Sequence, residues 1–272
     1  MIAQSIIHHA SLPAVSVAVK THLKLLSYNI QVGVASSRYR HYVTHSWKHV
    51  LPHSASFSNL DRIAHLLNDF DIVALQEVDA GSLRSLFVNQ VEYLAHKSRF
   101  PFWYHQTNRN LGKIAQASNG LLSKIEPSDI TDHKLPGFFP GRGAIAVQYG
   151  QAKNPLILLL AHLALGKRTR MRQLAYLADV ANQYKHVVLM GDMNCELDSQ
   201  EMQTLFNSTK LICPTTETSH TFPSWRPFCK LDHILVTPTL KVTHTSVLNH
   251  AISDHLPVAL EIKLPQDVHL RG

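Results

Sequence analysis

Cysteine is scarce in this sequence, with three residues in 272, at positions 195, 213 and 229. Their number is odd and their spacing matches no common zinc motif, so neither a disulfide framework nor a thiolate metal site is expected. So few thiols are typical of a reducing compartment, and we expect a cytoplasmic protein, with peripheral membrane association as the alternative. We interpret Cys195 as a packing residue.

Long hydrophobic runs are also missing. The N-terminal segment is mildly apolar, but two histidines and a proline interrupt it, and no lysine or arginine precedes Lys20. It is too broken for a transmembrane span and lacks the basic start of a signal peptide. We expect residues 1–22 to be a leader, either disordered or an edge strand, followed by one catalytic domain at 23–265 and a tail at 266–272.

Acidic residues are outnumbered, and charge of either sign is sparse. Charged residues make up 17% of the chain, the formal net charge is +7, and there are 19 histidines. A basic excess favours an anionic partner such as nucleic acid, an anionic lipid surface or a phosphorylated small molecule, although many basic proteins bind no polyanion. Nothing in the sequence indicates an obligate protein partner, and we expect a monomer.

Apolar runs recur along the chain, and several are continuous rather than alternating, as in strands buried on both faces. Helical periodicity separates some of them, at 58–70 with Ser58 as N-cap, and at 169–184 with Met171 on the apolar face. This alternation predicts one α/β domain. The stretch 99–142 is expected to form long surface loops with short strands. The predicted strands are 23–30, 71–78, 143–149, 155–164, 186–193, 231–238 and 257–264.

Polar residues gather at the ends of these predicted strands. A single one is most simply a cap or a loop hydrogen bond. Several together predict a cluster at one sheet edge, where carboxylates need a counter-cation, and their oxygen atoms suit Mg²⁺, Mn²⁺ or Ca²⁺. The residues concerned are Asn29, Glu77, His162, Asp192, Asn194, Asp232, Asp254 and His255.

The motifs that contain these residues follow one another in a recognisable order: SYNI (27–30), LQEVD (75–79), AHL (161–163), GDMN (191–194), LDHIL (231–235) and SDHLP (253–257). In this order they resemble the endonuclease/exonuclease/phosphatase superfamily, over roughly residues 23–264. The resemblance implies an α/β fold, a four-layer sandwich of two packed mixed β-sheets flanked by helices. It also implies a metal-dependent phosphoesterase with its site at one edge.

The resemblance assigns metal binding to Asn29, Glu77 and Asp254, with Mg²⁺ as the expected ion and Mn²⁺ as the alternative. Oxygen ligands of this kind suit a cation that neutralises a phosphoryl oxygen. Gly191 would let the backbone turn at the sheet edge beside these ligands.

The remaining motif residues are expected to carry catalysis. Asp192 would orient or deprotonate water, and Asn194 would donate to the developing negative charge. His255 and Asp232 would form an imidazole–carboxylate dyad, with His255 as either the base or a cationic clamp. His162 could donate to a phosphate oxygen or to the leaving group. We interpret His233, next to Asp232, as a buried structural histidine.

Two further residues are candidates for substrate binding. Arg142 could clamp a phosphate, and a loop salt bridge explains it equally well. Asn119 could face the site, or could simply be a turn residue. Downstream of His162, the basic run at 167–172 (Lys167, Arg168, Arg170, Arg172) could steer a polyanion or could merely be a solvated helix start.

Two aromatic segments bear on specificity. Histidines recur every four residues at His41, His45, His49 and His53. On a helix they would share one face, which is more often incidental than a transition-metal site. With Tyr39, Tyr42 and Trp47 this insert could be a substrate-side flap or could touch a membrane. The segment TFPSWRPF (221–228) could also shape specificity.

These features together predict a divalent-metal-dependent hydrolase that cleaves phosphodiester or phosphomonoester bonds through metal-activated water, with a nuclease-like phosphodiesterase preferred. The alternatives are a phospholipid or small-molecule phosphoesterase and, less favoured, a binding module with a dead site. Leu165 stands where apurinic endonucleases carry asparagine, which argues against a DNA-repair enzyme.

Overall fold

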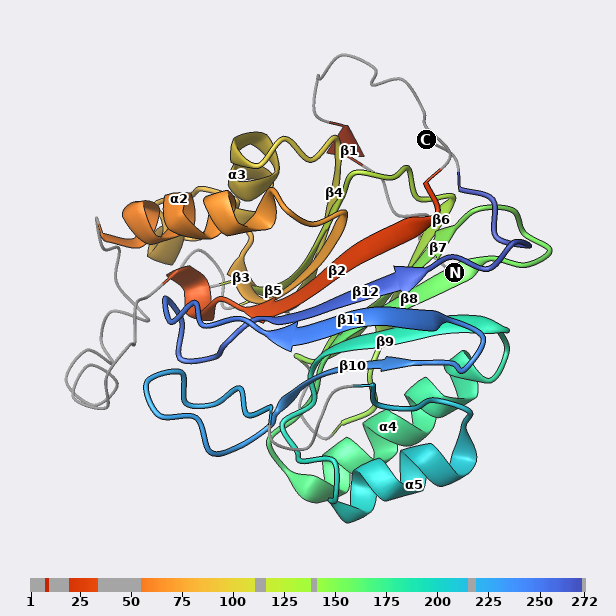
Figure 1. Ribbon diagram of the computed structural model, residues 1–272. Coiled ribbons are helices and arrows are strands. Elements are labelled where there is room, and N and C mark those ends of the chain that lie inside the picture. Colours follow the sequence, from red (N-terminus) through yellow and green to blue (C-terminus); the bar gives the residue numbers. More distant parts are fainter. Residues whose placement is uncertain are drawn as a thin grey trace.

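Two β-sheets stack face to face in the computed structural model, which describes residues 8–9, 20–33, 55–110, 116–137, 141–214 and 219–270. Helices α2 and α3 lie on the outer side of one sheet, and α4 and α5 lie on the outer side of the other (Figure 1). The expected four-layer α/β sandwich of two mixed sheets is confirmed.

The larger sheet has seven strands among the described residues, in the order β1-β4-β5-β3-β2-β12-β11. Its central pair, β2 and β3, is parallel, and its other neighbouring strands are antiparallel. The strands are β1 (His8–His9), β2 (His22–Asn29), β3 (Ile72–Asp79), β4 (Phe102–Asn110), β5 (Gln116–Ser123), β11 (Lys241–Val247) and β12 (Val258–Lys263).

The smaller sheet has five described strands in the order β10-β9-β8-β7-β6. Strands β8 and β9 are parallel, and the remaining pairs are antiparallel. The strands are β6 (Asp129–Lys134), β7 (Gly143–Tyr149), β8 (Leu156–His162), β9 (His186–Asp192) and β10 (Asp232–Val236).

The core lies in three layers, as the continuous apolar strands predict. One cluster fills the space between the sheets, with Leu25 and Leu260 from one side and Leu158 and Val188 from the other. A second cluster joins the seven-stranded sheet to α2 (Ala55–Leu67) and α3 (Gln90–Lys97). A third joins the five-stranded sheet to α4 (Lys167–Ala181) and α5 (Gln200–Ser208). Strands β8 and β9 are buried along their whole length because both faces are covered.

Two helix predictions need correction. Helix α2 begins at Ala55, so Ser58 lies inside its first turns and is not an N-cap. The apolar face extends earlier because Phe57 packs against the helix–sheet core and the ring of Tyr93. On α4, Met171 is 36% exposed, whereas Leu174 is buried, so Met171 is not part of the buried face.

The prediction of long surface loops with short strands at 99–142 is right about the strands but underestimates them for most of that stretch. Strands β4, β5 and β6 occupy it, and β5 lies inside the larger sheet between β4 and β3. The positions and lengths of these strands were not predicted, because polar side chains such as Gln106, Asn119 and Ser123 are buried in them. Their polar sequence resembles that of a loop, but Gln106 and Asn119 donate to backbone carbonyls of β7 in the facing sheet.

The histidine-rich insert at 41–53, with Tyr39, lies outside the described residues. Among the helices that the structure describes, none is both long enough and apolar enough to cross a membrane. Strand β1, within the expected leader, pairs with β4 at the edge of the larger sheet.

Candidate active site

The sheet topology brings the polar strand ends to one edge of the molecule. Asn29 ends β2, and the parallel strand β3 carries Glu77 near its end. In the other sheet, His162 and Asp192 end the parallel strands β8 and β9 and lie opposite each other. Asp232, which begins the antiparallel strand β10, is paired with Asp192.

Two contacts join the sheets at this edge. The side-chain amide nitrogen of Asn29 donates to Oδ2 of Asp192 at 3.1 Å. Nε2 of His162 lies 4.0 Å from Oε1 of Glu77 and 3.5 Å from Oδ2 of Asp192. The site is therefore a seam between the two sheets.

Asp192 lies at the centre of the cluster. It is 1% exposed, and its Oδ1 accepts the backbone N–H of Asn194 at 2.9 Å. Burial raises the pKa of Asp192 to about 7, with the charge of Asp232 adding to the rise against the charge of His255. Burial next to a second carboxylate therefore makes Asp192 costly to ionise, even beside His255.

Gly191 places Asp192 by a close approach that only glycine allows. Its φ is 145°, and a Cβ atom there would come within 1.8 Å of the carbonyl oxygen of Ala161 on β8. The chain can therefore keep the β8–β9 pairing up to the site.

His255 and Asp232 form the expected pair. Nδ1 of His255 lies 2.8 Å from Oδ2 of Asp232, and Nε2 faces Oδ2 of Asp192 at 3.8 Å. Burial alone would lower the pKa of His255, but the charges of Asp232 and Asp192 outweigh it and raise the pKa to about 10. The ring of Phe222 contacts the imidazole at a centroid distance of 4.8 Å.

His162 has the opposite electrostatic character. Burial, followed by the charges of Arg142 and His255, holds its pKa well below the usual 6.5. Burial thus favours the neutral form of His162, whereas the two neighbouring carboxylates favour the cationic form of His255.

Glu77 and Asp254 occupy the side of the seam formed by the larger sheet. Glu77 has a left-handed backbone, φ 55°, where β3 bulges against β5, and its side chain is 40% exposed. Asp254 is buried, and burial raises its pKa to about 6, with the charge of Glu77 contributing. Gln31 donates from its side-chain nitrogen to Asp254 at 3.0 Å.

The loop after β9 is held in a fixed shape. Asn194 is left-handed, φ 52°, a conformation that asparagine tolerates, and its side-chain nitrogen donates to the carbonyl of Leu163 at 3.0 Å. Met193 and Cys195 are buried in the core. The buried His233 donates to the carbonyl of Cys195 at 2.8 Å, which makes it the structural histidine that the sequence suggested.

Asn119 and Arg142 were the two candidates for substrate binding. Asn119 is 2% exposed and donates to the carbonyl of Gly143 at 3.0 Å, so it links β5 to the start of β7. Arg142 precedes Gly143 and is near enough to His162 to lower its pKa. Their assignment to substrate binding stays a prediction.

Two residues of the site were not predicted from the sequence. Gln31 is 5% exposed, has φ 45°, and keeps a buried Oε1 without a hydrogen-bond partner. Phe222 packs on His255. The only available signal was their position, two residues after Asn29 and within the aromatic segment 221–228.

The residues present fit a divalent cation. Nitrogen or oxygen atoms of Asp192, Asp232 and His255 lie within 4.8 Å of one another, and the buried Oδ1 of Asp232 has no hydrogen-bond partner. Bound positive charge would relieve both the unpartnered oxygen and the raised pKa of Asp192. Glu77 and Asp254 add carboxylate oxygens across the seam, and oxygen donors suit hard cations.

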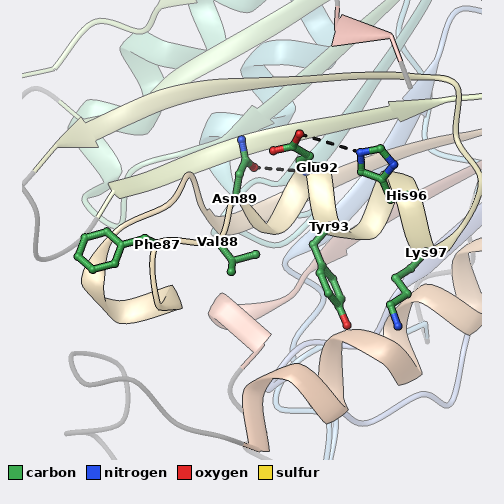
Figure 2. A pocket seen from close by; sticks show the side chains of 7 residues that line it. All are labelled: Phe87, Val88, Asn89, Glu92, Tyr93, His96 and Lys97. Atoms are coloured by element: carbon green, nitrogen blue, oxygen red, sulfur yellow. Dashed lines mark hydrogen bonds and ion pairs between the residues drawn. The ribbon is translucent and has the colours of Figure 1, made fainter. Parts of the chain in front are cut away.

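A hollow of about 550 Å³ lies over α3 and the segment that precedes it (Figure 2). It is lined by Phe87, Val88, Asn89, Glu92, Tyr93, His96 and Lys97. None of the seam residues lines it, so the hollow is not the active site.

The protein is an α/β sandwich of two facing mixed sheets with helices outside. It carries an acid–imidazole cluster where the strand ends of the two sheets meet. A model of the Endonuclease/Exonuclease/phosphatase family matches residues 26–255, which include the seam residues from both sheets. The chain belongs to this family. No curated protein matches it in sequence.

Solved structures share the fold at low sequence identity. An endonuclease/exonuclease/phosphatase from Beutenbergia cavernae has a TM-score of 0.68 and 19% identity, over 90% of this chain and 72% of that one. A mannosyl-6-phosphatase from Bacteroides thetaiotaomicron has a TM-score of 0.66 and 16% sequence identity, over 89% of this chain and 100% of that one. The human Nocturnin catalytic domain with bound sulfate has a TM-score of 0.64 and 16% sequence identity, over 90% of this chain and 94% of that one.

Proposed function

We propose that this protein is a divalent-metal-dependent hydrolase of phosphoric esters, with a nuclease-like phosphodiesterase as the preferred form. One observation carries the proposal: the Asn29 amide and the imidazoles of His162 and His255 converge on the carboxylate of Asp192 at the seam between the sheets. Such a cluster has the groups that phosphoryl transfer needs, namely a proton acceptor, donors for phosphoryl oxygens and ligands for a cation.

Asp192 would hold and deprotonate the attacking water. It is fixed by Asn29 and by the backbone of Asn194, so its carboxylate is preorganised. His255 is tied to Asp232 through Nδ1 and presents Nε2 toward Asp192, where it would donate to a phosphoryl oxygen. One hydrogen of the Asn194 amide is used by Leu163, and the other would donate to the substrate.

Asn29, Glu77 and Asp254 would hold the cation, which we propose to be Mg²⁺ or Mn²⁺. Glu77 suits this role because its carboxylate is partly exposed at the seam, whereas Oδ2 of Asp232 is engaged by His255 and only its buried Oδ1 is left to face a nearby cation. When bound, the cation would neutralise charge on the phosphoryl oxygens.

Two structural neighbours support a phosphate-containing substrate. One is a mannosyl-6-phosphatase, and another holds a sulfate anion. The net charge of +7 favours a polyanion or an anionic surface, so nucleic acid and phospholipid are the two main substrate classes to compare. We also propose that the protein acts as a monomer through a domain spanning about 23–265, in the cytoplasm or at a membrane surface.

A substrate panel tests this proposal. Purified protein is incubated with bis(p-nitrophenyl) phosphate, p-nitrophenyl phosphate, plasmid, single-stranded DNA, RNA, phospholipids and inositol phosphates. Each is measured with Mg²⁺, with Mn²⁺ and with a chelator. We expect metal-dependent turnover of at least one ester. If folded protein turns over none of them with either metal, a binding module with an inactive site is the better account.

A further inference from the structure

Large apolar side chains are exposed around the seam. In the segment that follows β3, Leu83, Leu86 and Phe87 are 40%, 49% and 61% exposed. On the other sheet, Leu165 is 75% exposed and Phe228 is 63% exposed. We call these five residues the apolar rim.

The rim residues lie at the same edge as the catalytic cluster. Leu165 follows His162, the last residue of β8, by three positions, and Phe228 precedes Asp232, the first residue of β10, by four. The segment with Leu83 begins where β3 ends, beyond Glu77. Because these strand ends meet at the seam, the rim borders the site from both sheets.

The exposed position of Leu86 and Phe87 is built into the backbone. Both are left-handed, with φ 55° and 61°, a strained conformation for such side chains. The buried Asp79 supports the turn: it accepts from Gly81 N, Ser82 N, Ser82 Oγ and Ser85 Oγ at 2.7–2.9 Å. Figure 2 shows Phe87 pointing away from α3. The hydrogen bonds around Asp79 thus support the turn that exposes Leu86 and Phe87.

Exposed cations accompany the rim. Lys167, Arg168 and Arg172 are exposed at the start of α4, directly after Leu165, and Arg226 is exposed two residues before Phe228. Arg170 differs from them because it pairs with the buried Glu201 at 2.7 Å and donates to the carbonyls of Ala164 and Leu165. The basic run therefore divides into one structural arginine and three exposed cations that can face an anionic partner.

We propose that the apolar rim and these exposed cations dock the protein onto an anionic lipid bilayer. The rim side chains enter the interface, and the cations face anionic headgroups. The substrate class that follows is a phosphoester in the headgroup of an amphiphile. This substrate class rests on the proposed function, whereas docking to a bilayer does not depend on it. Aliphatic side chains such as Leu83 and Leu165 gain little from a nucleic-acid backbone but gain from leaving water for lipid.

Vesicle binding tests the docking. The probe protein is full-length Asp192→Asn, which should leave the lipid intact, and the probes are phosphatidylcholine vesicles with and without phosphatidylserine, in a flotation assay. We expect binding that is stronger with phosphatidylserine. Leu86→Asn with Phe87→Asn, and separately Leu165→Asn with Phe228→Asn, should each lower partitioning by about tenfold or more.

Charge and position have their own variants. Lys167→Gln with Arg168→Gln should lower binding to anionic vesicles by about tenfold or more and should leave neutral vesicles unaffected. Ile212→Asn is the matched apolar control, because Ile212 is also exposed, at 48%, but lies outside the rim. It pairs with Val236, at the opposite end of β10 from Asp232. Thermal melting of each variant confirms folding.

Several results would overturn docking: no binding to either vesicle, rim variants that bind like the wild type, a loss in Ile212→Asn equal to that of the rim variants, or rim variants that instead abolish DNA binding or self-association. The two proposals fail separately. Wild type that hydrolyses soluble diesters but binds no vesicle refutes docking. If the wild-type protein binds vesicles but hydrolyses no ester, the proposed hydrolase activity is refuted and docking stands.

Discussion

At the residue scale, the seam depends on pairs in which one side chain fixes another. Asp232 fixes the ring of His255 at 2.8 Å, and Asn29 fixes the carboxylate of Asp192 at 3.1 Å. Such support holds reacting groups in place before a substrate arrives, and phosphoryl transfer depends mainly on positioning and charge.

Asp232→Asn should lower kcat for a soluble diester by on the order of 10²- to 10⁴-fold, because an amide cannot stabilise the imidazolium of His255. The measurement is steady-state kinetics with saturating metal. Asp198→Asn, at an exposed carboxylate before α5, is the control and should keep wild-type kinetics. A wild-type kcat in Asp232→Asn would remove the dyad from the mechanism.

Gln31 should act as a positioning residue through Asp254. Gln31→Asn tolerates the left-handed backbone but is too short to keep the 3.0 Å hydrogen bond, so the apparent metal affinity should fall about tenfold. Titration calorimetry with Mn²⁺ measures this affinity without turnover. Gln203→Asn on the exposed side of α5 is the control. Equal affinities in Gln31→Asn and wild type would reduce Gln31 to a structural role.

At the element scale, the strands that could be predicted are those with continuous apolar sequence, and their polar ends identified the seam. The positions and lengths of strands β4 and β5 could not be predicted, because the buried side chains of Gln106 and Asn119 find their partners only when the two sheets pack together. The apolar rim was equally hidden, since nothing in the sequence distinguishes an exposed Leu86 from a core leucine. The role of Gln31 depends on a turn that brings it against Asp254, 223 positions away.

Gly191→Ala should disrupt the β8–β9 pairing, because its Cβ atom would lie 1.8 Å from a backbone oxygen in a strained φ region. We expect a loss of more than about 2 kcal/mol in unfolding free energy. Gly166→Ala is the matched control: a Cβ atom added at Gly166 would have no atom within 4 Å, so the cost should stay below about 1 kcal/mol. Chemical denaturation measures both, and similar losses would contradict this explanation of β9.

At the scale of the whole molecule, the two sheets are joined at both ends. The seam joins them at the edge that carries the candidate site. At the far end, the segment after β12 returns to the start of β9, where Asp267 accepts from Lys185 at 2.6 Å and lies 3.3 Å from His186. A site shared between sheets requires this relative placement to be stable.

The contribution of Asp267 should depend on pH. The hydrogen bond from Lys185 is the main cause that lowers the pKa of Asp267 from 3.8 to about 2. A carboxyl group whose pKa is lowered by folding stabilises the fold at pH values above its ordinary pKa of 3.8. This contribution to stability disappears as the pH falls through about 2. The melting temperature of Asp267→Asn should therefore be below that of wild type at neutral pH, and the difference should shrink in acid. A constant or growing difference would contradict the assignment.

The central claim is that Asp192 and a divalent cation act together on a phosphoric ester. The most direct measurement is the rate of bis(p-nitrophenyl) phosphate hydrolysis by wild type with Mg²⁺ or Mn²⁺, by wild type with chelator, and by Asp192→Asn with metal. We predict turnover in the first case and a decrease of at least about 10²-fold in the other two. Hydrolysis by Asp192→Asn at a rate near that of wild type, or full activity in chelator, would contradict the claim.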